Sequence, residues 1–331
     1  MDWLSRLLDI MPVSGHLDIR CLYGAPWRLS INRSKPGEIP YHIVVEGTAM
    51  LEDTDKGLPQ LLKAGDILLF PHGIAHTLHD GSGAPPKPAR DRQSLNLTVS
   101  ENAGTGDRLD MLCGYFVITP PYDRILHDYL PPRLVVHTAG DKVSAAHPTT
   151  SAQLAGLVAL MRTESANESL GGHAMLNAFS AAMFALTLRL ASESDTAPAG
   201  LLALAGQPRL TPALAALFRN PAHPWTLPEL ARLCNMSRAT FARHFQQTMG
   251  ASASDLLMDI RMSVAANELK KPSLSTGDVA EAVGYQSDAA FQRAFKQRMG
   301  ITPARWRRAA RSLESEAHLT GWSSKGVVAK L

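Results

Sequence analysis

The side chains with the most reactive chemistry in this sequence of 331 residues are two cysteines, Cys21 and Cys113. They lie in Arg20-Cys-Leu-Tyr and Leu112-Cys-Gly-Tyr-Phe, stretches that are typical of β-strands. Arg20 beside Cys21 favours the thiolate, which oxidants attack first, and a second thiol nearby would resolve the oxidised sulfur as a disulfide. The alternative is that both cysteines are small buried hydrophobic residues, and the sequence leaves both interpretations open.

A second group of side chains has the types that bind divalent metal ions. His42 and Glu46 are four residues apart, and His76 follows later in the chain. Imidazole nitrogens and carboxylate oxygens are common ligands of such ions, so these three residues are candidate ligands, with His72 and His79 as nearby alternatives. The other interpretation is that these side chains bond to turn backbone and line an empty or ligand-binding pocket.

Residues 224–308 contain one pattern twice, and each copy predicts a helix, a tight turn and a second helix. The first copy runs from Glu229 to Gly250 and the second from Asp278 to Gly300. The copies align at an offset of fifty at their C-terminal ends and forty-nine at their starts, so the second turn has one extra residue. Such a repeat indicates a repeated structural unit.

The residues within each copy are typical of a helix-turn-helix motif. A turn residue that accepts left-handed backbone, Asn235 or Gly284, precedes a helix-capping serine, Ser237 or Ser287. The second helix of each copy keeps one apolar face, formed by Phe241, Phe245, Met249, Phe291, Phe295 and Met299. In such motifs the second helix lays its N-terminal residues against base edges in the major groove of DNA. Residues 252–271 have helical apolar spacing and would hold the two units in fixed relation.

The charge of this region also favours DNA as a partner. Residues 224–311 carry thirteen Lys and Arg against seven Asp and Glu, a net charge of +6, whereas the whole chain has +3. A basic module on a slightly acidic body suits contact with phosphates. A helical bundle with ordinary surface charge is the alternative. Cys234 aligns with Val283 of the second copy and is interpreted as a packing residue.

These residues resemble the AraC/XylS family of transcription regulators. The matching motifs are Trp225-Thr-Leu-x-x-Leu-Ala, Met236-Ser-Arg-x-x-Phe-x-Arg-x-Phe, Arg261-Met262, Val279-Ala-x-x-Val-Gly-Tyr-x-Ser-x-x-Ala-Phe-x-Arg-Ala-Phe and Gly300-Ile-Thr-Pro-x-x-Trp-Arg307. The resemblance implies a regulator rather than an enzyme. Such a regulator spans two successive major-groove segments on one face of double-stranded promoter DNA. It also implies RNA polymerase as a further partner.

The resemblance places base-reading positions early in the second helix of each unit. They are Arg238, Ala239, Ala242 and Arg243 in the first unit, and Asp288, Ala289, Gln292 and Arg293 in the second. Arg243 and Arg293 can reach guanine O6 and N7, and Gln292 can reach adenine N6 and N7. The two alanines of the first unit offer only methyl contacts. Contact with phosphate is the alternative role for each arginine.

From Leu17 to about Arg133 the pattern changes to short strands between turns that contain Gly and Pro. The expected strands are Leu17–Tyr23, Trp27–Asn32, Tyr41–Glu46, Thr48–Glu52, Gln60–Leu62, Asp66–Phe70, Ser94–Val99 and Met111–Ile118. This spacing predicts a small antiparallel barrel or jelly roll. Residues 80–92 and 101–108 lack this pattern and are expected to be surface loops.

The N-terminal half resembles the cupin sensors that are fused to AraC-type modules. The second cupin motif is present as Gly65-x5-Pro71-x-Gly73-x2-His76-x3-Asp80. The first is eroded, because Pro40 and Tyr41 stand where an earlier histidine would lie. The resemblance implies a cupin-type β-barrel in which His42, Glu46 and His76 are the candidate ligands of a divalent metal. The expected fold class is α+β: this barrel plus a helix pair, followed by an all-α domain with two helix-turn-helix units.

The resemblance also extends to a subgroup of cupin-bearing activators. An early cysteine and a Cys-Gly-Tyr-Phe element occur in regulators that respond to reactive chlorine species through cysteine oxidation. For this chain, the resemblance implies redox sensing by Cys21 and Cys113. The alternative is a regulator that responds to a small-molecule effector or a metal bound in the cupin pocket.

The remaining segments define the expected domains. Residues 1–193 are expected to form the sensor and dimerisation domain, 194–209 a linker, 210–311 the DNA-binding domain and 312–331 a flexible tail. The first domain has helical patterns at residues 1–10, 123–130, 150–164 and 172–193. The last of these is apolar around much of its surface and must be covered. In the family, helices after the barrel form a dimer interface, so the resemblance implies a homodimer.

No membrane partner or export segment is expected. Residues 1–10 carry Asp2, Arg6 and Asp9 on an amphipathic helix, unlike a signal peptide. The most apolar run, residues 174–190, is short for a membrane span and contains Arg189. Three cysteines at wide spacing do not make a secreted disulfide framework. These features predict a cytoplasmic protein.

Overall fold

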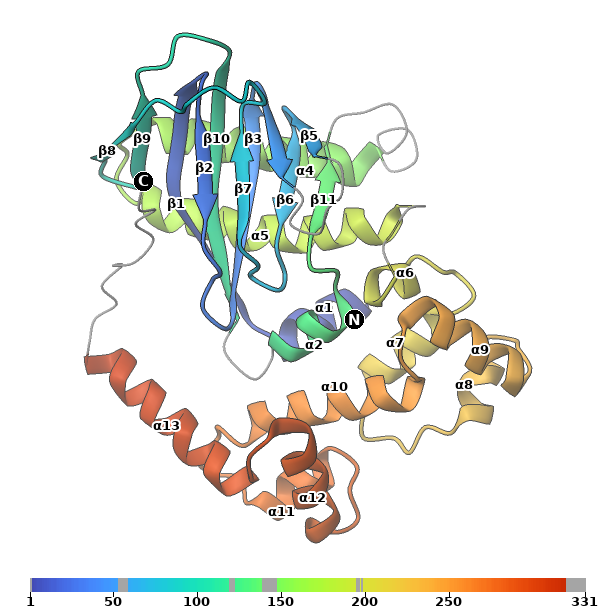
Figure 1. Ribbon diagram of the computed structural model, residues 1–331. Helices are drawn as coiled ribbons and strands as arrows, with labels where there is room; N and C mark the ends of the chain where they lie inside the picture. The colour runs from blue at the N-terminus through green and yellow to red at the C-terminus, as the bar shows by residue number, and fades with distance from the viewer. Residues whose placement is uncertain are drawn as a thin grey trace. The chain divides into compact units, whose positions relative to one another are not determined.

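The computed structural model describes residues 2–52, 59–118, 123–138, 148–194, 197 and 199–319, apart from the side chains of 123, 124 and 312–319. The chain forms two compact units (Figure 1). The sheet unit takes its residues from 13–120 and 130–197, and the helical unit from 1–12, 121–129 and 198–328. The helical unit is therefore discontinuous, because part of it lies between two strands of the sheet unit in the sequence.

The sheet unit consists of two β-sheets around an apolar core. Its strands are β1 (Val13–Gly24), β2 (Arg28–Ile31), β3 (Glu38–Glu46), β4 (Thr48–Glu52), β5 (Gln60–Lys63), β6 (Asp66–Leu69), β7 (His76–His79), β8 (Ala89–Gln93), β9 (Thr98–Asn102), β10 (Arg108–Ile118) and β11 (Leu134–His137). Seven strands form a sheet in the order β11-β6-β3-β10-β1-β9-β8, and four form a sheet in the order β2-β7-β4-β5. Strands β1 and β9 are parallel, and the other pairs among the described strands are antiparallel.

Alternation along the strands decides which side chains face the core between the sheets. On β1, Cys21 and Tyr23 belong to this core, whereas Arg20 bonds to Ser165 on the opposite side. On β10, which is the neighbour of β1, Cys113 also belongs to the core. Both sulfurs therefore lie in the apolar interior of the sheet unit.

Two helices, α4 (Pro148–Ala166) and α5 (Gly172–Glu193), cover the outer face of the large sheet (Figure 1). The hydroxyls of Tyr41 and Ser180 are 2.8 Å apart. A Cβ on Gly15 of β1 would overlap Ser180, so the close approach of α5 to β1 requires glycine at this position. Helix α5 is long and apolar enough to cross a membrane, but 44% of its apolar window is buried within the protein, as in a core helix.

The helical unit contains both repeated motifs and two helices from the N-terminal half. Its helices are α1 (Trp3–Ile10), α2 (Asp123–Tyr129), α6 (Leu201–Ala205), α7 (Thr211–Arg219), α8 (Leu227–Leu233), α9 (Arg238–Met249), α10 (Ala253–Glu268), α11 (Thr276–Ala282), α12 (Asp288–Met299) and α13 (Pro303–Leu319). Helix α1 buries Leu4, Leu7 and Ile10 against α7 and α10. The amide of Asn267 donates to the Ile10 carbonyl at 2.6 Å, which fixes the end of α1.

The predicted α+β class, with a cupin-type β domain before a helical domain with two helix-turn-helix units, is confirmed. The expected bounds of β4 and of α5 agree with the structure at both ends. Helix α13 continues to Leu319, so the first part of the expected tail is helical, and residues 320–331 lie outside the described residues. The expected linker contains the short helix α6.

Other expectations about the strands were wrong. Ser94 begins a turn, closed by its N–H to the Leu97 carbonyl, so β9 starts only at Thr98. Strand β8 occupies the end of an expected loop, and its side chains are mostly exposed, so it lacks the apolar alternation of a buried strand. Strands β7 and β11, of four residues each, were not among the expected strands.

Candidate functional site

Each repeated motif folds as a helix-turn-helix unit. Helices α8 and α9 form the first unit and α11 and α12 the second. Both units begin with a capping box, at Thr226 and at Ser275. The first turn contains Asn235 with φ 51°, and the second contains Gly284 with φ 87°. Left-handed backbone at these points turns each chain sharply, as the sequence predicts.

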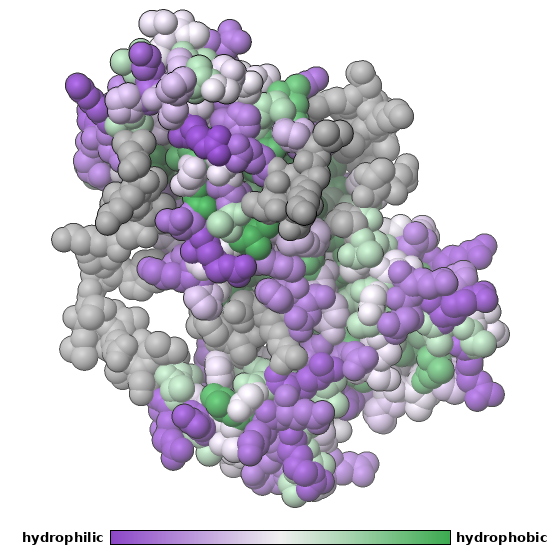
Figure 2. All heavy atoms as spheres, viewed as in Figure 1, coloured by the Kyte–Doolittle hydropathy of each residue, from purple (hydrophilic) through white to green (hydrophobic). Residues whose placement is uncertain are grey.

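The second helices, α9 and α12, expose the side chains that the sequence assigns to base reading. Arg238, Ala239, Ala242, Arg243, Asp288, Ala289, Gln292 and Arg293 are all exposed. The opposite faces bury the phenylalanines, for example Phe241 and Phe291, which fix each helix on its unit. The Gln292 amide donates to the Asp288 carboxylate at 2.8 Å, so its orientation is set before DNA arrives. The surface over α9 and α12 is largely hydrophilic (Figure 2).

Helix α10 and its Arg261 connect the two helix-turn-helix units. The guanidinium of Arg261 donates to the Pro221 carbonyl at 2.6 Å and to the His223 carbonyl at 2.9 Å, in the loop before the first unit. The same group lies 5.9 Å from the ring centre of Tyr285, in the turn of the second unit. This half-buried guanidinium therefore contacts the loop before the first helix-turn-helix unit and the turn of the second.

If Arg243 and Arg293 read guanines, replacing either by Ala should weaken binding to a specific duplex by about 1–3 kcal/mol, because a bidentate arginine–guanine contact would be lost. The duplex is selected from a random-sequence pool with the wild-type chain, and affinity is measured by fluorescence anisotropy. An equal loss on unselected DNA would assign the arginine to phosphate contact instead. Arg219→Ala, at the end of α7, is the control.

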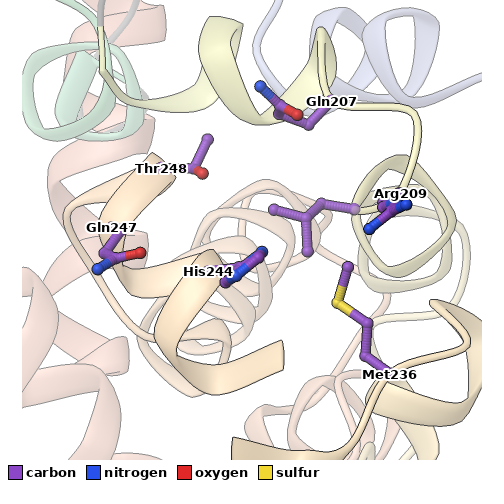
Figure 3. Close-up of a pocket in the computed structure, with 7 residues that line it drawn as sticks. Gln207, Arg209, Met236, His244, Gln247 and Thr248 are labelled. Carbon is purple, nitrogen blue, oxygen red and sulfur yellow. The ribbon is translucent and has the colours of Figure 1, made fainter. Parts of the chain in front are cut away.

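A polar pocket of about 430 Å³ lies beside α9. Figure 3 shows His244, Gln247 and Thr248 of α9 around it, with Gln207 and Arg209 from the segment between α6 and α7. None of these residues is among the eight positions that the resemblance assigns to base reading. Helix α9 thus presents one face to this pocket and another, which carries four of those positions, to solvent.

In the sheet unit, the structure brings Cys21 and Cys113 together. The two sulfurs lie 3.9 Å apart in the core, and the residues are 2% and 8% exposed. They sit on the adjacent strands β1 and β10, offset by two residues. Cys234, in contrast, is a buried residue of the helical unit, at the end of α8.

A chain of hydrogen bonds leads from Cys113 to backbone. Its sulfur lies 3.1 Å from His42 Nδ1, and His42 Nε2 lies 2.8 Å from His76 Nε2. The other nitrogen of His76 lies 3.0 Å from the Ile74 carbonyl, which can only accept. His76 Nδ1 therefore carries a proton, His42 Nε2 donates to His76, and the thiol of Cys113 donates to His42 Nδ1. The proton between the two sulfurs then belongs to Cys21.

The environment keeps Cys113, His42 and His76 neutral. The hydrogen bond with Cys21 and burial raise the pKa of Cys113 well above its usual value. Burial, aided by His76, holds the pKa of His42 well below its usual value, and burial lowers the pKa of His76 to about 4. Both imidazoles are therefore neutral at neutral pH, each with one N–H proton.

The expected role of Arg20 is wrong. Its guanidinium makes two bonds to Asp110, at 2.9 and 2.7 Å, on the outer face of the sheet. Cys21 points to the inner face, because neighbouring residues on a strand alternate. Arg20 therefore pairs with Asp110 and does not stabilise a thiolate of Cys21, and His42 is the imidazole in contact with the cysteine pair.

The expected set of metal ligands is not brought together. Glu46 lies on the surface, where it pairs with Arg162 at 3.0 Å. His72 approaches the Leu130 carbonyl, and His79 accepts from the Gly81 N–H. Among the described residues no three His, Cys, Asp or Glu side chains form a group that could hold a metal ion. His42 and His76 bond to each other instead, so the residues present do not fit a divalent metal centre.

Comparisons with known proteins agree with this organisation. The profile of the cupin family matches residues 2–193, and that of a helix-turn-helix domain matches residues 230–309. An uncharacterized HTH-type transcriptional regulator of Haemophilus influenzae is 30% identical over 310 residues, which cover 93% of this chain and 99% of that protein. The RCS-specific HTH-type transcriptional activator RclR of Escherichia coli is 28% identical over 313 residues, 95% of this chain and 99% of RclR.

A DNA-binding domain is among the similar solved structures. The DNA-binding domain of AdpA, in complex with a target DNA, is 28% identical and covers 33% of this chain and 98% of that chain, with a TM-score of 0.31. Two helix-turn-helix units that follow a β-sheet domain in the sequence define a DNA-binding transcription regulator. The chain belongs to the AraC family of these regulators, and its N-terminal half is a cupin domain.

Proposed function

We propose that this chain is a redox-switched transcription regulator in which Cys21 and Cys113 sense an oxidant. The observation that carries the proposal is the 3.9 Å separation of the two sulfurs. The Nδ1 atom of His42 lies 3.1 Å from the Cys113 sulfur. A nucleophile, a base and a resolving thiol are thus in contact. The relative RclR is called RCS-specific, which supports reactive chlorine as the class of oxidant.

The chemistry uses only these groups and the oxidant. Cys113 sulfur attacks the chlorine of hypochlorous acid, the O–Cl bond breaks, and the thiol proton passes through His42 to the departing hydroxide as water. Cys21 sulfur then attacks the sulfenyl chloride of Cys113, displaces chloride and releases its own proton. Two thiols and one hypochlorous acid give one disulfide, water, chloride and a proton. A small neutral oxidant suits two buried thiols, because entry of a charged one is costly.

The disulfide would change DNA binding by linkage. A signal changes affinity only if it alters the free-energy difference between the competent and incompetent arrangements. Closing the sulfur separation from 3.9 Å to about 2 Å moves β1 against β10, and both strands continue into helices of the helical unit. We propose that the oxidised chain recruits RNA polymerase as an activator in the cytoplasm. Transcription with purified polymerase, with and without hypochlorite, tests the sign.

The proposal is tested by non-reducing peptide mass spectrometry of the purified chain before and after brief, substoichiometric hypochlorite. We expect a linked peptide that joins Cys21 to Cys113, with Cys234 still a free thiol. Two reduced thiols, or only methionine sulfoxide, would contradict the proposal. That outcome would favour an effector bound in the cupin domain, detected as a rise in thermal stability on ligand addition.

We also propose that α4 and α5 form a homodimer interface. Their solvent faces carry apolar side chains, among them Leu160 at 54% exposure and Met175 at 44%. Ala178 lies exposed on the same helix as Met175, one turn away. An exposed apolar face of two packed helices suits a second copy of the same surface.

Ala178→Arg should convert the dimer to a monomer, because a charge is buried without a partner. Sedimentation velocity on the full chain measures the change. Ala84→Arg, at an exposed loop position, is the matched control and should remain dimeric. A wild-type monomer, or an Ala178→Arg dimer of unchanged affinity, would refute this interface.

A further inference from the structure

Helix α2 connects the strands of the sheet unit to the helical unit. In sequence it lies between β10, which carries Cys113, and β11, but it packs within the helical unit. Its last residue, Tyr129, is only 6% exposed. The next residue, Leu130, already belongs to the sheet unit. Any movement of these strands is therefore applied to Tyr129 through the main chain.

The side chain of Tyr129 bonds to α10, which in turn contacts the second helix-turn-helix unit. Its hydroxyl donates to the Asp259 carboxylate on α10, which is 4% exposed. The other oxygen of Asp259 lies 3.4 Å from Arg298 Nε, near the end of α12. Arg298 also donates to Asp255 at 3.0 Å. Burial and Asp259 raise the pKa of Tyr129, so the hydroxyl stays protonated and remains a donor.

The main chain of Tyr129 contacts Gly200, which in turn bonds to α9 of the first helix-turn-helix unit. Gly200, with φ 125°, packs so tightly that a Cβ would overlap the Tyr129 carbonyl oxygen and lie 3.3 Å from its carbon. The N–H of Gly200 donates to the Thr248 carbonyl of α9 at 2.9 Å. One residue is thus linked to both second helices of the motifs, through Gly200 to α9 and through Asp259 to α12.

We propose that Tyr129 is a positioning residue that sets α9 and α12 relative to each other according to the state of the sheet unit. The argument for the contact rests on the helical unit alone, and only the nature of the signal rests on the proposed function. Helix α1 provides a parallel link, because it precedes β1 with Cys21 and is fixed by Asn267 at Ile10. Both cysteine strands are therefore joined in sequence to a helix that contacts α10.

Hydrogen-exchange mass spectrometry on the full chain tests this proposal with Tyr129→Phe, which removes only the hydroxyl. In the reduced state we expect amides of α10 and α12 to exchange about tenfold faster than in wild type, because a buried carboxylate loses a donor. After hypochlorite, wild type should change its exchange in α10 and α12, and Tyr129→Phe should not, although its disulfide forms to the same extent. Tyr115→Phe, at a half-buried tyrosine of β10 that stacks on His16, is the control and should behave as wild type.

The outcomes separate this inference from the proposed function. Wild-type exchange in the reduced Tyr129→Phe chain, or an unchanged oxidant effect in it, would overturn the role of Tyr129. A wild-type chain that forms no disulfide would defeat the redox signal, while the reduced-state comparison would still decide the role of Tyr129. If Tyr129→Phe does not fold, Arg298→Gln interrupts the same connection from a partly exposed position.

Discussion

Cys113→Ser should abolish the effect of hypochlorite on DNA affinity and leave the affinity of the untreated chain within about threefold of wild type. Coupling between two sites in regulatory proteins is commonly worth about 1–3 kcal/mol, which is a five- to 150-fold change in affinity. A serine hydroxyl can donate to His42 as the thiol does, but it is not oxidised and forms no disulfide. The change in DNA affinity that hypochlorite causes should therefore fall from this range to no change. Anisotropy on the selected duplex measures it, with and without oxidant.

Cys21→Ser should also abolish the effect of hypochlorite on DNA affinity, but for a different chemical reason. Cys113 can still react in that variant, but no second thiol lies against it, so oxidation continues to sulfinic acid rather than to a disulfide. Intact-mass measurement would show the added oxygen atoms. Cys234→Ser is the control, and it should keep the full response because Cys234 belongs to the helical unit. A full response in both single variants would refute the cysteine switch.

Gly284→Ala should destabilise the helical unit by at least about 3 kcal/mol and abolish specific DNA binding. A left-handed φ of 87° costs about 1–2 kcal/mol for alanine on its own. The new Cβ would also overlap the Ala222 carbonyl oxygen and lie 2.9 Å from its carbon. The loop cannot retreat freely, because Arg261 holds the carbonyls on both sides of Ala222. Urea unfolding of the full chain, followed by tryptophan fluorescence, gives the stability.

Gly300→Ala is the matched control for this prediction. Gly300 has φ 76°, but a Cβ there would meet nothing within 4 Å. Its substitution should therefore cost only the backbone term of about 1–2 kcal/mol. Equal losses for the two variants would show that the contact with Ala222 does not restrict the turn.

The sequence predicted the helical unit better than the strands. A repeat with glycine or asparagine at the turn and phenylalanine on one face fixes each unit locally, so the helices and the exposed positions such as Arg243 follow from short-range patterns. The sheet depends on pairing between distant strands. Strand β8 has exposed charged side chains and forms because its backbone pairs with that of β9. No local sequence pattern indicates this pairing.

The same distinction applies to the cysteine site. The sequence named Cys21, Cys113, His42 and His76, but it grouped the histidines with Glu46 as metal ligands. Register places Cys113 directly opposite His42 on β3, and that pairing is a long-range property. The sequence also attributed influence to Arg20 because it is adjacent to Cys21, although adjacent residues on a strand face opposite sides. Tyr129 was missed altogether, because its partners lie far along the chain.

The division of the helical unit has a consequence for synthesis on the ribosome. Helices α1 and α2 emerge before the whole of α7 and α10, against which α1 packs, and before Asp259. The strands of the sheet unit are complete by residue 137, and its covering helices by residue 193. A nascent chain can therefore finish the sheet unit while the apolar face of α1 waits uncovered for later residues. A fragment that ends at residue 193 keeps the same exposed face, so it is the full-length chain that should be the more soluble of the two.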